Sequence, residues 1–331
     1  MKKTSFIAWV RYDRRPDLLA ERFGTKPHYI VVGQQGKLWQ APLRYPIQAW
    51  KTWRLLRRER PDVVYVQNPP IFAVLVVYLY ARLHGAQYII DSHTSAFIAP
   101  RWRWALGLLR RLARGALTVI VHNKAQADIV KQWGVPYVVI GFLAGDYPPG
   151  SPYPLKEAGN GNHEPFHVAV ISTYELDEPL DVVFEAARQM PDVSFYVTGD
   201  SRRITPDLLA LKPDNCHLTG FVPYDQYIGL LRQAGTIIDL TTRNHTLLMG
   251  GFEAVSLGTP LITSDWPILR QYFSRGTVHI PNSVEGVCQG VRYAQQHEAT
   301  LRKEMAALKA ALDAEWQVKS AELWELIHDE Q

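Results

Sequence analysis

Short apolar runs rich in β-branched and aromatic residues recur along the chain and alternate with longer segments of helical periodicity. Continuous apolar runs of this kind are typical of strands buried on both faces of a parallel sheet. The first half contains the runs Phe6–Val10, Tyr29–Val32, Val63–Val66, Tyr88–Ile90, Leu117–Val121 and Tyr137–Ile140. The second half contains Phe166–Ile171, Ser194–Thr198, Thr236–Leu240, Pro260–Thr263 and Thr277–Ile280. The pattern predicts an α/β protein with two doubly wound parallel sheets.

The two halves are separated by Tyr147–Pro165, a segment rich in Pro, Gly and Asn that is typical of a linker. The pattern therefore predicts one domain over residues 1–147, a linker over 148–165 and a second domain over 166–312. A chain of 331 residues is long enough for two such cores. The remaining segment, 313–331, continues a long helical pattern that begins near His297.

The net charge of +4 conceals an uneven distribution of charge. Residues 1–150 contain 22 Lys and Arg against 8 Asp and Glu, whereas residues 151–331 contain 14 against 24. A basic half indicates a membrane surface, a nucleic acid or an anionic ligand as partner. The sequence contains no RNA-binding signature and no zinc-finger spacing, so we expect no nucleic acid. Tryptophans interspersed with the arginines favour a lipid interface.

Two basic segments with tryptophans, 46–60 and 98–114, are candidates for that interface. In the second segment Leu106, Leu109, Leu112 and Ala113 share one helix face, which suits insertion into an anionic interface. The same stripe could instead pack on the sheet. The apolar helix Ile71–Leu83 is shorter than the roughly 20 residues that span a bilayer. The expectation is peripheral attachment to the inner face of the membrane.

The cysteines and the N-terminus favour the cytoplasm. Cys216 and Cys288 show no metal-like spacing and no disulfide framework, which fits a reducing compartment. The first apolar run, Phe6–Val10, is too short for the core of a signal peptide. We therefore interpret it as the first strand.

The segment Thr241–Asp265 carries the clearest candidate chemistry. It follows a predicted strand, and Gly250 and Gly251 open a helix that contains Glu253. A helix start after a strand offers free N–H groups and a positive dipole end to a phosphate, while a carboxylate can accept hydrogen bonds from a ribose diol. This βαβ unit predicts a site for a nucleotide diphosphate. The alternative is a helix packed on a sheet, with glycines serving only tight turns.

A second candidate site follows the fourth predicted strand. Asp91 and His93 lie two residues apart at its end, so both side chains point to one side. His93 could act as a base on a hydroxyl group or only donate a hydrogen bond, and a structural role is the alternative. The basic loop Arg11–Arg15 after the first strand could meet an anion through its side chains or could be merely solvated.

The stretch GGFEAVSLGTPLITSD resembles the donor-binding segment of GT-B glycosyltransferases, especially family 4 and its relatives. The resemblance implies a GT-B architecture, with two Rossmann-like domains facing a cleft and the last helix returning to the first domain through Trp316 and Trp324. It places Glu253 on the ribose of a nucleotide sugar. Family 4 usually has a second glutamate where this chain has His245, which leaves the donor sugar and the stereochemical outcome open.

The resemblance extends to other parts of the second half. The family usually has an Arg and a Lys near the loop after the first strand of this domain, and neither is present here. Ser172, Thr173, the amides of Gly250 and Gly251, and Arg202 are the groups left to bind the diphosphate. The segment from Cys216 fits the part of the family that encloses the base with its backbone, at Gly220, Phe221 and Val222. A strand explains that segment equally well.

Two further stretches, VQNPP before an apolar helix and ISTYELDEPLDVVFEA, resemble the dolichol-pathway β-mannosyltransferases that extend chitobiosyl-diphosphodolichol. The resemblance implies a lipid-diphosphate acceptor. No Asp-x-Asp pair lies at a matching place, so we expect no metal and no other cofactor.

The resemblance, taken together with the basic first half, implies a glycosyltransferase that moves a hexose-type sugar from a nucleotide diphosphate sugar to a lipid-linked or membrane-proximal glycan acceptor. Such a reaction belongs to polysaccharide or glycolipid biosynthesis. Two alternatives stay open, namely a nucleotide-sugar epimerase on the same fold and a non-catalytic partner subunit that binds the nucleotide sugar. A dinucleotide oxidoreductase is disfavoured because no G-x-G-x-x-G follows either opening strand.

Overall fold

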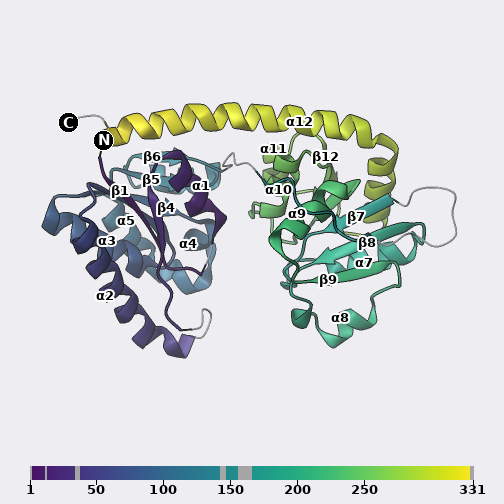
Figure 1. Cartoon of the computed structure of the whole chain (residues 1–331), viewed down its shortest axis with the longest axis horizontal. Coiled ribbons are helices and arrows are strands. Elements are labelled where there is room, and N and C mark those ends of the chain that lie inside the picture. Colours follow the sequence, from purple (N-terminus) through teal and green to yellow (C-terminus); the bar gives the residue numbers. More distant parts are fainter. Residues whose placement is uncertain (1, 12, 34–37, 142–146, 156–165, 329–331) are drawn as a thin grey trace. The chain divides into compact units, whose positions relative to one another are not determined.

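The computed structural model describes residues 2–11, 13–33, 38–141, 147–155 and 166–328. It divides into two compact units, each with its own sheet (Figure 1). Unit 1 contains residues 1–144 and 313–331, and unit 2 contains residues 145–312. The start of the predicted linker packs on unit 2, where Ser151 N donates to Asp225 O at 3.0 Å and Tyr153 N donates to Gln233 Oε1 at 2.7 Å. Residues 156–165 of that linker lie outside the described residues.

The sheet of unit 1 contains six parallel strands in the order β2-β1-β3-β4-β5-β6. They are β1 Thr4–Ala8, β2 Lys26–Tyr29, β3 Val63–Asn68, β4 Gln87–Ser92, β5 Thr118–Val121 and β6 Tyr137–Val139. The predicted runs all contribute to these strands, but β2 lies earlier than its apolar run Tyr29–Val32. Its register with β1 pairs Ser5 with Lys26, so the edge strand uses partly exposed residues that the apolar pattern does not mark.

Helices cover both faces of this sheet. They are α1 Arg14–Arg22, α2 Ala41–Glu59, α3 Ile71–His84, α4 Thr94–Ile98, α5 Leu106–Ala113 and α6 Lys124–Lys131, with the 3₁₀ helices η1 Leu38–Gln40 and η2 Pro100–Ala105. Along β3, Val64 and Val66 join the core under α3 and α5, whereas Val63 and Tyr65 join the core on the opposite face. This period of two, with both faces apolar, is the pattern of a sheet covered on both sides.

The last helix, α12 Val284–His328, also belongs in part to unit 1. It has a non-helical residue at His297. Near its end Trp316, Leu323 and Ile327 join the core beneath β1 and β3. The Trp324 ring stacks on Phe23 with a centroid separation of 6.3 Å.

The sheet of unit 2 is also six-stranded and parallel, in the order β12-β11-β10-β7-β8-β9. Its strands are β7 Phe166–Val170, β8 Val193–Thr198, β9 Cys216–Gly220, β10 Thr236–Asp239, β11 Leu261–Ser264 and β12 Thr277–Ile280. The prediction of two doubly wound parallel sheets is confirmed. The segment from Cys216 is a strand, as the alternative interpretation expected. Its sequence CHLTG has no continuous apolar run, because β9 is an edge strand with four partly exposed residues.

The helices of unit 2 are α7 Leu180–Arg188, α8 Pro206–Ala210, α9 Tyr224–Gln233, α10 Met249–Leu257 and α11 Pro267–Tyr272, with the 3₁₀ helix η3 Ser201–Arg203. The predicted βαβ unit is β10–α10–β11. Gly258 ends α10 with a left-handed φ of 71°. A Cβ on Gly251 would lie 2.5 Å from the Phe273 ring, so this glycine lets α10 approach the core closely. Within the described residues, no helix combines the length and the apolar character needed to cross a bilayer.

Candidate functional site

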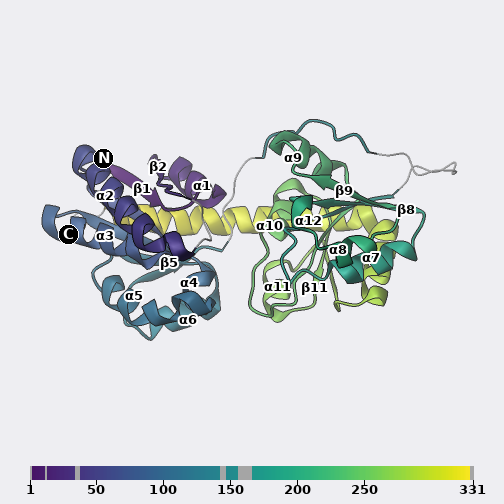
Figure 2. The same ribbon diagram turned by 90° about the horizontal axis from the view of Figure 1, so that it is seen from below.

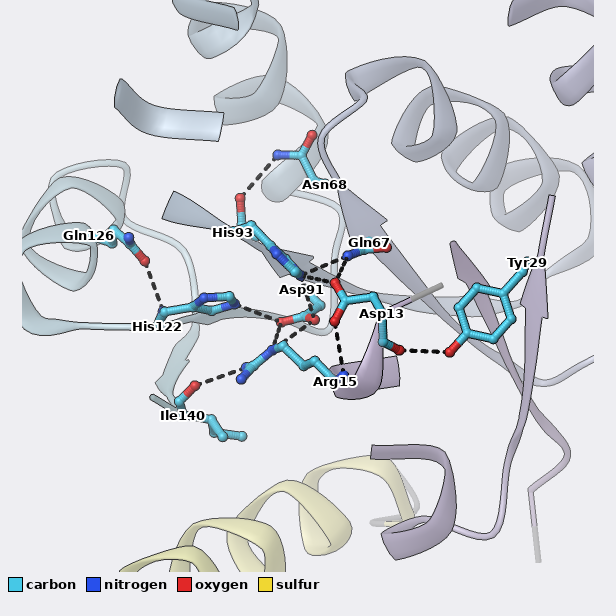
Figure 3. A network of polar contacts seen from close by, with 11 residues as sticks. Asp13, Arg15, Tyr29, Gln67, Asn68, Asp91, His93, His122, Gln126 and Ile140 are labelled. Atoms are coloured by element: carbon cyan, nitrogen blue, oxygen red, sulfur yellow. Dashed lines mark hydrogen bonds and ion pairs between the residues drawn. The ribbon is translucent and has the colours of Figure 1, made fainter. Parts of the chain in front are cut away.

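Five strands of unit 1 end at one edge of its sheet, and a network of polar side chains occupies that edge (Figure 3). Its members are Asp13 and Arg15 after β1, Gln67 in β3, Asp91 in β4, His93 after β4, His122 after β5 and Ile140 after β6. The carboxyl ends of parallel strands are where α/β folds bind their ligands.

Asp91 is the centre of this network and is fully buried. Arg15 Nε lies 3.1 Å from each carboxylate oxygen of Asp91, and Arg15 Nη2 donates to Ile140 O at 2.9 Å. Burial opposes ionisation of Asp91. The Arg15 guanidinium and the two neighbouring histidines outweigh burial and hold its pKa well below the ordinary value. With no exposed surface, this carboxylate can influence a ligand only through its neighbours.

His93 lies in front of Asp91, with 21% of its side chain exposed. Its Nε2 atom is 3.5 Å from Asp91 Oδ2 and 3.9 Å from Asp13 Oδ2. Gln67 Nε2 donates to Asp13 Oδ2 at 2.7 Å and lies 3.0 Å from His93 Nε2. Carboxylates beside an imidazole orient the ring and offset the charge it gains on accepting a proton. His93 is therefore suited to proton transfer.

His122 completes the network from the other side of Asp91, with its Nε2 atom 3.6 Å from Asp91 Oδ1. Burial and the charges of Arg15 and His93 lower the pKa of His122 to about 3, so it is neutral at neutral pH. The donor atoms of Asp91, His93 and His122 lie within 4.8 Å of one another, a spacing that could hold a metal ion. The Arg15 guanidinium already binds both carboxylate oxygens of Asp91, so a metal ion would have to displace it.

The sequence singled out Asp91 and His93 at this edge but not Asp13, Gln67 or His122. Each of the three lies at or just after the end of a strand, and that position is the signal that could have indicated them. Arg15 belongs to the basic loop for which an anion was expected. The anion it meets is the internal carboxylate of Asp91.

At the corresponding edge of unit 2, Glu253 of α10 is mostly buried and accepts a hydrogen bond from Tyr227 Oη of α9. Burial raises the pKa of Glu253 to about 7, even though the hydrogen bond from Tyr227 lowers it. Glu253 is thus close to half ionised at neutral pH. A buried carboxylate with a single hydroxyl donor can accept further hydroxyl groups from a ligand.

The first glycines of α10 contact a second buried carboxylate. The N–H groups of Gly250 and Gly251 hydrogen-bond to Asp239 at the end of β10. A Cβ on Gly250 would lie 2.4 Å from Asp239 Oδ2, so only glycine permits this approach. Burial and the charges of Glu253 and Glu178 raise the pKa of Asp239 well above its ordinary value. The amides predicted to bind phosphate are therefore bonded to an internal acid in this structure.

Ser172 and Thr173, at the end of β7, are likewise bonded to an internal acid. Ser172 Oγ donates to Glu178 Oε2 at 2.6 Å, and Thr173 Oγ1 donates to Glu178 Oε1 at 2.6 Å. Thr173 N donates to the same carboxylate at 2.9 Å. Two hydroxyls and one amide thus converge on a single carboxylate, which is the donor set expected of an anion-binding loop. The sequence did not single out Glu178.

The remaining predicted residues of unit 2 lie elsewhere. Arg202 is exposed and pairs with Asp200 through Nε at 2.8 Å and Nη2 at 2.7 Å. Gly220 is the last residue of β9, at the far edge of the sheet, and approaches Ser201. Phe221 and Val222 follow it, and the Phe221 side chain is exposed. His245 is exposed in the loop before α10. The structure thus brings Ser172, Thr173, Gly250, Gly251 and Glu253 around Asp239 and Glu178, but it does not bring His245 into that group.

The fold is similar along its whole length to solved structures. Anabaena HepE, solved with UDP and glucose, covers 98% of this chain and 99% of its own, at 13% identity and a TM-score of 0.72. Sucrose-phosphate synthase from Thermosynechococcus elongatus covers 98% of both chains, at 12% identity and a TM-score of 0.70. A Listeria monocytogenes protein assigned as a UDP-N-acetylglucosamine 2-epimerase covers 98% of this chain and 97% of its own, at 12% identity and a TM-score of 0.62.

Two family models match the sequence itself. The glycosyl transferase 4-like domain matches residues 10–143, and the model described as glycosyl transferase-like matches residues 181–321. One covers most of the unit 1 sheet, and the other covers most of unit 2. The chain belongs to the GT-B glycosyltransferases.

For this glycosyltransferase the expected family and fold are confirmed. Its likeness to the dolichol-pathway β-mannosyltransferases remains a prediction. No curated protein matches the sequence.

Proposed function

We propose that this glycosyltransferase takes a hexose-type sugar from a nucleotide diphosphate sugar bound to unit 2. The observation that carries the proposal is Glu253, a mostly buried carboxylate with a pKa near 7 and one hydroxyl donor. In its ionised form it would accept both hydroxyls of a ribose, which offsets the cost of burying the charge. Anabaena HepE, a protein of similar fold, has been solved with UDP and with UDP-glucose, so UDP-glucose is the first donor to test.

The rest of the donor would occupy the adjacent groups. The diphosphate would take the donors of Ser172 and Thr173 together with the α10 amides, which Glu178 and Asp239 must then release. Arg202 would approach the diphosphate by leaving Asp200. The base would lie near Gly220, Phe221 and Val222, and His245 would face the donor sugar.

Acceptor activation is assigned to unit 1. His93 would remove the proton from the acceptor hydroxyl as its oxygen attacks the anomeric carbon. The bond from that carbon to the diphosphate then breaks, and the nucleoside diphosphate leaves. Asp91 would act as a positioning residue, since its buried carboxylate, fixed by Arg15, holds negative charge beside the imidazole. This reaction has no step that requires a metal ion.

The acceptor proposed here is lipid-linked or lies at a membrane surface. The basic character of residues 1–150 supports this choice, because an anionic bilayer attracts a basic surface by roughly 1 kcal/mol per basic residue close to it. The protein would act in the cytoplasm, attached peripherally to the inner face of the membrane, in the synthesis of a polysaccharide or glycolipid.

A nucleotide-sugar epimerase is the rival function, because one structure of similar fold is assigned as such an enzyme. A non-catalytic partner subunit is a second rival, since the usual second glutamate is replaced by His245. The three functions differ in their need for an acceptor. An epimerase turns over without one, and a partner subunit binds without turnover.

The test is release of UDP from UDP-glucose, measured with and without membrane lipid extract and followed by NMR of the nucleotide sugar. Release that depends on the extract and is lost in His93→Ala supports the transferase. A change in the sugar configuration without extract would establish the epimerase. Tight UDP-glucose binding without turnover in any extract would support the partner subunit.

A further inference from the structure

In the second of the two segments expected at a membrane, 98–114, the helix α5 packs inward, whereas Ile98 and Trp104 are exposed. Leu109, Leu112 and Ala113 of α5 are buried in the main core of unit 1, and Trp102 is buried beside them. The apolar stripe of this helix therefore has no surface left for lipid. Its arginines can still provide charge, but the apolar part of any membrane contact must lie elsewhere.

An apolar groove lies between α2 and α3. These two helices pack side by side, and α5 lies on the other side of α3 (Figure 2). Its volume is about 570 Å³, and its walls include Pro42, Tyr45 and Pro46 of α2 with Phe72, Leu75 and Val76 of α3. Nearly all of the lining is hydrocarbon. A site of this size falls within the range that holds a small ligand or part of a lipid chain.

Three exposed tryptophans either adjoin the groove residues in the sequence or contact the groove wall. Trp39 lies in η1, just before α2, and is 76% exposed. Trp50 follows Ala49 of the groove wall and is 58% exposed. Trp104 is 62% exposed. The Trp104 ring lies 6.1 Å from that of Phe72. Exposed tryptophans are typical of the boundary between hydrocarbon and lipid headgroups, where one part of the ring is buried and the N–H is solvated.

The positive charge around the groove indicates which kind of partner can bind there. Residues 38–58 contain Arg44, Lys51, Arg54, Arg57 and Arg58 and no acidic residue. Residues 93–117 add five arginines, again without an acid. The guanidinium groups of Arg44 and Arg54 lie over the rings of Tyr45 and Trp50, at 4.9 and 5.5 Å from their centroids. A second copy of this face would bring like charges together, whereas an anionic bilayer complements both the charge and the apolar groove.

We infer that the face formed by η1, α2 and α3 docks on an anionic phospholipid bilayer and takes one lipid acyl chain into the groove between α2 and α3. The inference rests on the membrane attachment proposed above. It places the apolar contact on α2, which contains most of the expected segment 46–60, and on α3, rather than on α5.

The test uses flotation with vesicles of phosphatidylcholine and phosphatidylglycerol, in which a fraction of the phosphatidylglycerol carries a diazirine on one acyl chain. After illumination, labelled peptides should come from α2 and α3. The double variant Trp39→Ala/Trp50→Ala should lose about tenfold or more of its vesicle binding, because two interfacial anchors are removed. Both residues are exposed, and thermal unfolding checks that the fold is retained.

The matched control is Leu209→Ala/Leu211→Ala, which removes two exposed apolar side chains from unit 2 and should bind vesicles like the unchanged protein. Labels on α5 or unit 2, or full binding by the tryptophan variant, would overturn the groove assignment while leaving membrane attachment intact. Failure of the unchanged protein to float with anionic vesicles at low salt would overturn both. If the tryptophan variant instead converted a dimer to a monomer, the face would belong to a second copy. Flotation needs no nucleotide, so a failed transferase assay is a separate result.

Discussion

Asp91 and Asp239 are both buried aspartates at the carboxyl end of a strand, one in each unit, and their surroundings shift their pKa values in opposite directions. Asp91 lies against the Arg15 guanidinium and has a lowered pKa. Asp239 faces Glu253 and Glu178 and has a raised pKa. Burial alone disfavours charge in both, so the neighbouring group decides the outcome. The strand position is shared, but the chemistry is not.

This difference in pKa suits the carboxyl-end edges of the two sheets to different chemistry. In unit 1 a fixed negative charge stands behind His93, as an imidazole that accepts a proton requires. In unit 2 buried carboxylates lie close together, and among the described residues no basic side chain is a main cause of the pKa shift of Asp239 or Glu253. Four nearby arginines, namely Arg202, Arg203, Arg243 and Arg270, each pair with a surface or half-buried acid. Buried carboxyl groups with raised pKa values suit a ligand rich in hydroxyl groups.

The largest expected effect is a loss of reaction rate when His93 of unit 1 is replaced. His93→Ala should lower the rate of acceptor-dependent UDP release by about 10² to 10⁴, the usual contribution of a general base. Binding of UDP-glucose should stay within about twofold, because His93 lies in the other unit. Loss of donor binding together with the rate, seen by calorimetry, would show that His93 has a structural role instead.

The next prediction compares the two aspartates directly. Asp91→Asn should reduce the free energy of unfolding by about 3–5 kcal/mol, because it leaves Arg15 buried without its counter-charge. Asp239→Asn should change it by less than about 1 kcal/mol, because the pKa of Asp239 is raised well above its ordinary value and the amide replaces a carboxyl group whose charged form is disfavoured by burial. Denaturant unfolding of the two variants measures both. Equal losses would mean that the two buried acids are not in different charge states.

The pH dependence of stability should also differ between the two edges. Asp91 has a lowered pKa in the folded state, so its contribution is present above its ordinary pKa and is lost as the pH falls below it. Glu253 has its pKa raised from 4.5 to about 7, so it makes the fold less stable as pH rises through that window. The effect amounts to about 3 kcal/mol at most.

The variant Glu253→Gln isolates that contribution. Unfolding curves recorded from pH 5 to pH 8 should show a shallower fall in stability for the variant than for the unchanged protein. Asp239 titrates in the same direction, so some slope should remain. Identical slopes would show that Glu253 keeps an ordinary pKa.

The sequence predicted the architecture well, because the periodicity of apolar residues reports which faces are buried. Five strands of unit 2 stood out as apolar runs, whereas the edge strand β9 had too little buried surface to mark it. The other edge strand, β2, lies earlier in the sequence than predicted for the same reason. Gly258 as the stop of α10 was predictable, since a left-handed residue favours glycine.

The residues of the candidate sites were predictable only where they lie together in one short segment of the sequence. Glu253 was found from its position after a glycine pair, but Tyr227 comes from another helix and Asp239 from the strand before the loop. Glu178 lies only five residues from Thr173, yet no local pattern shows that its carboxylate turns back onto that loop. The internal pairing of Arg15 with Asp91, 76 residues apart, depends on strand order that the sequence leaves unstated.

The central claim is that Glu253 receives the ribose of the donor, and calorimetric titration with UDP-glucose at pH 8 tests it most directly. The diphosphate of this donor carries no proton that titrates near neutrality, so changes in affinity report on the protein. Glu253→Gln should weaken binding by about 1.5–3 kcal/mol, the range for hydrogen bonds to a charged group. The unchanged protein should bind more weakly at pH 6, where Glu253 is protonated, and the variant should lose this pH dependence. Equal affinity of the variant and the unchanged protein at pH 8 would contradict the account.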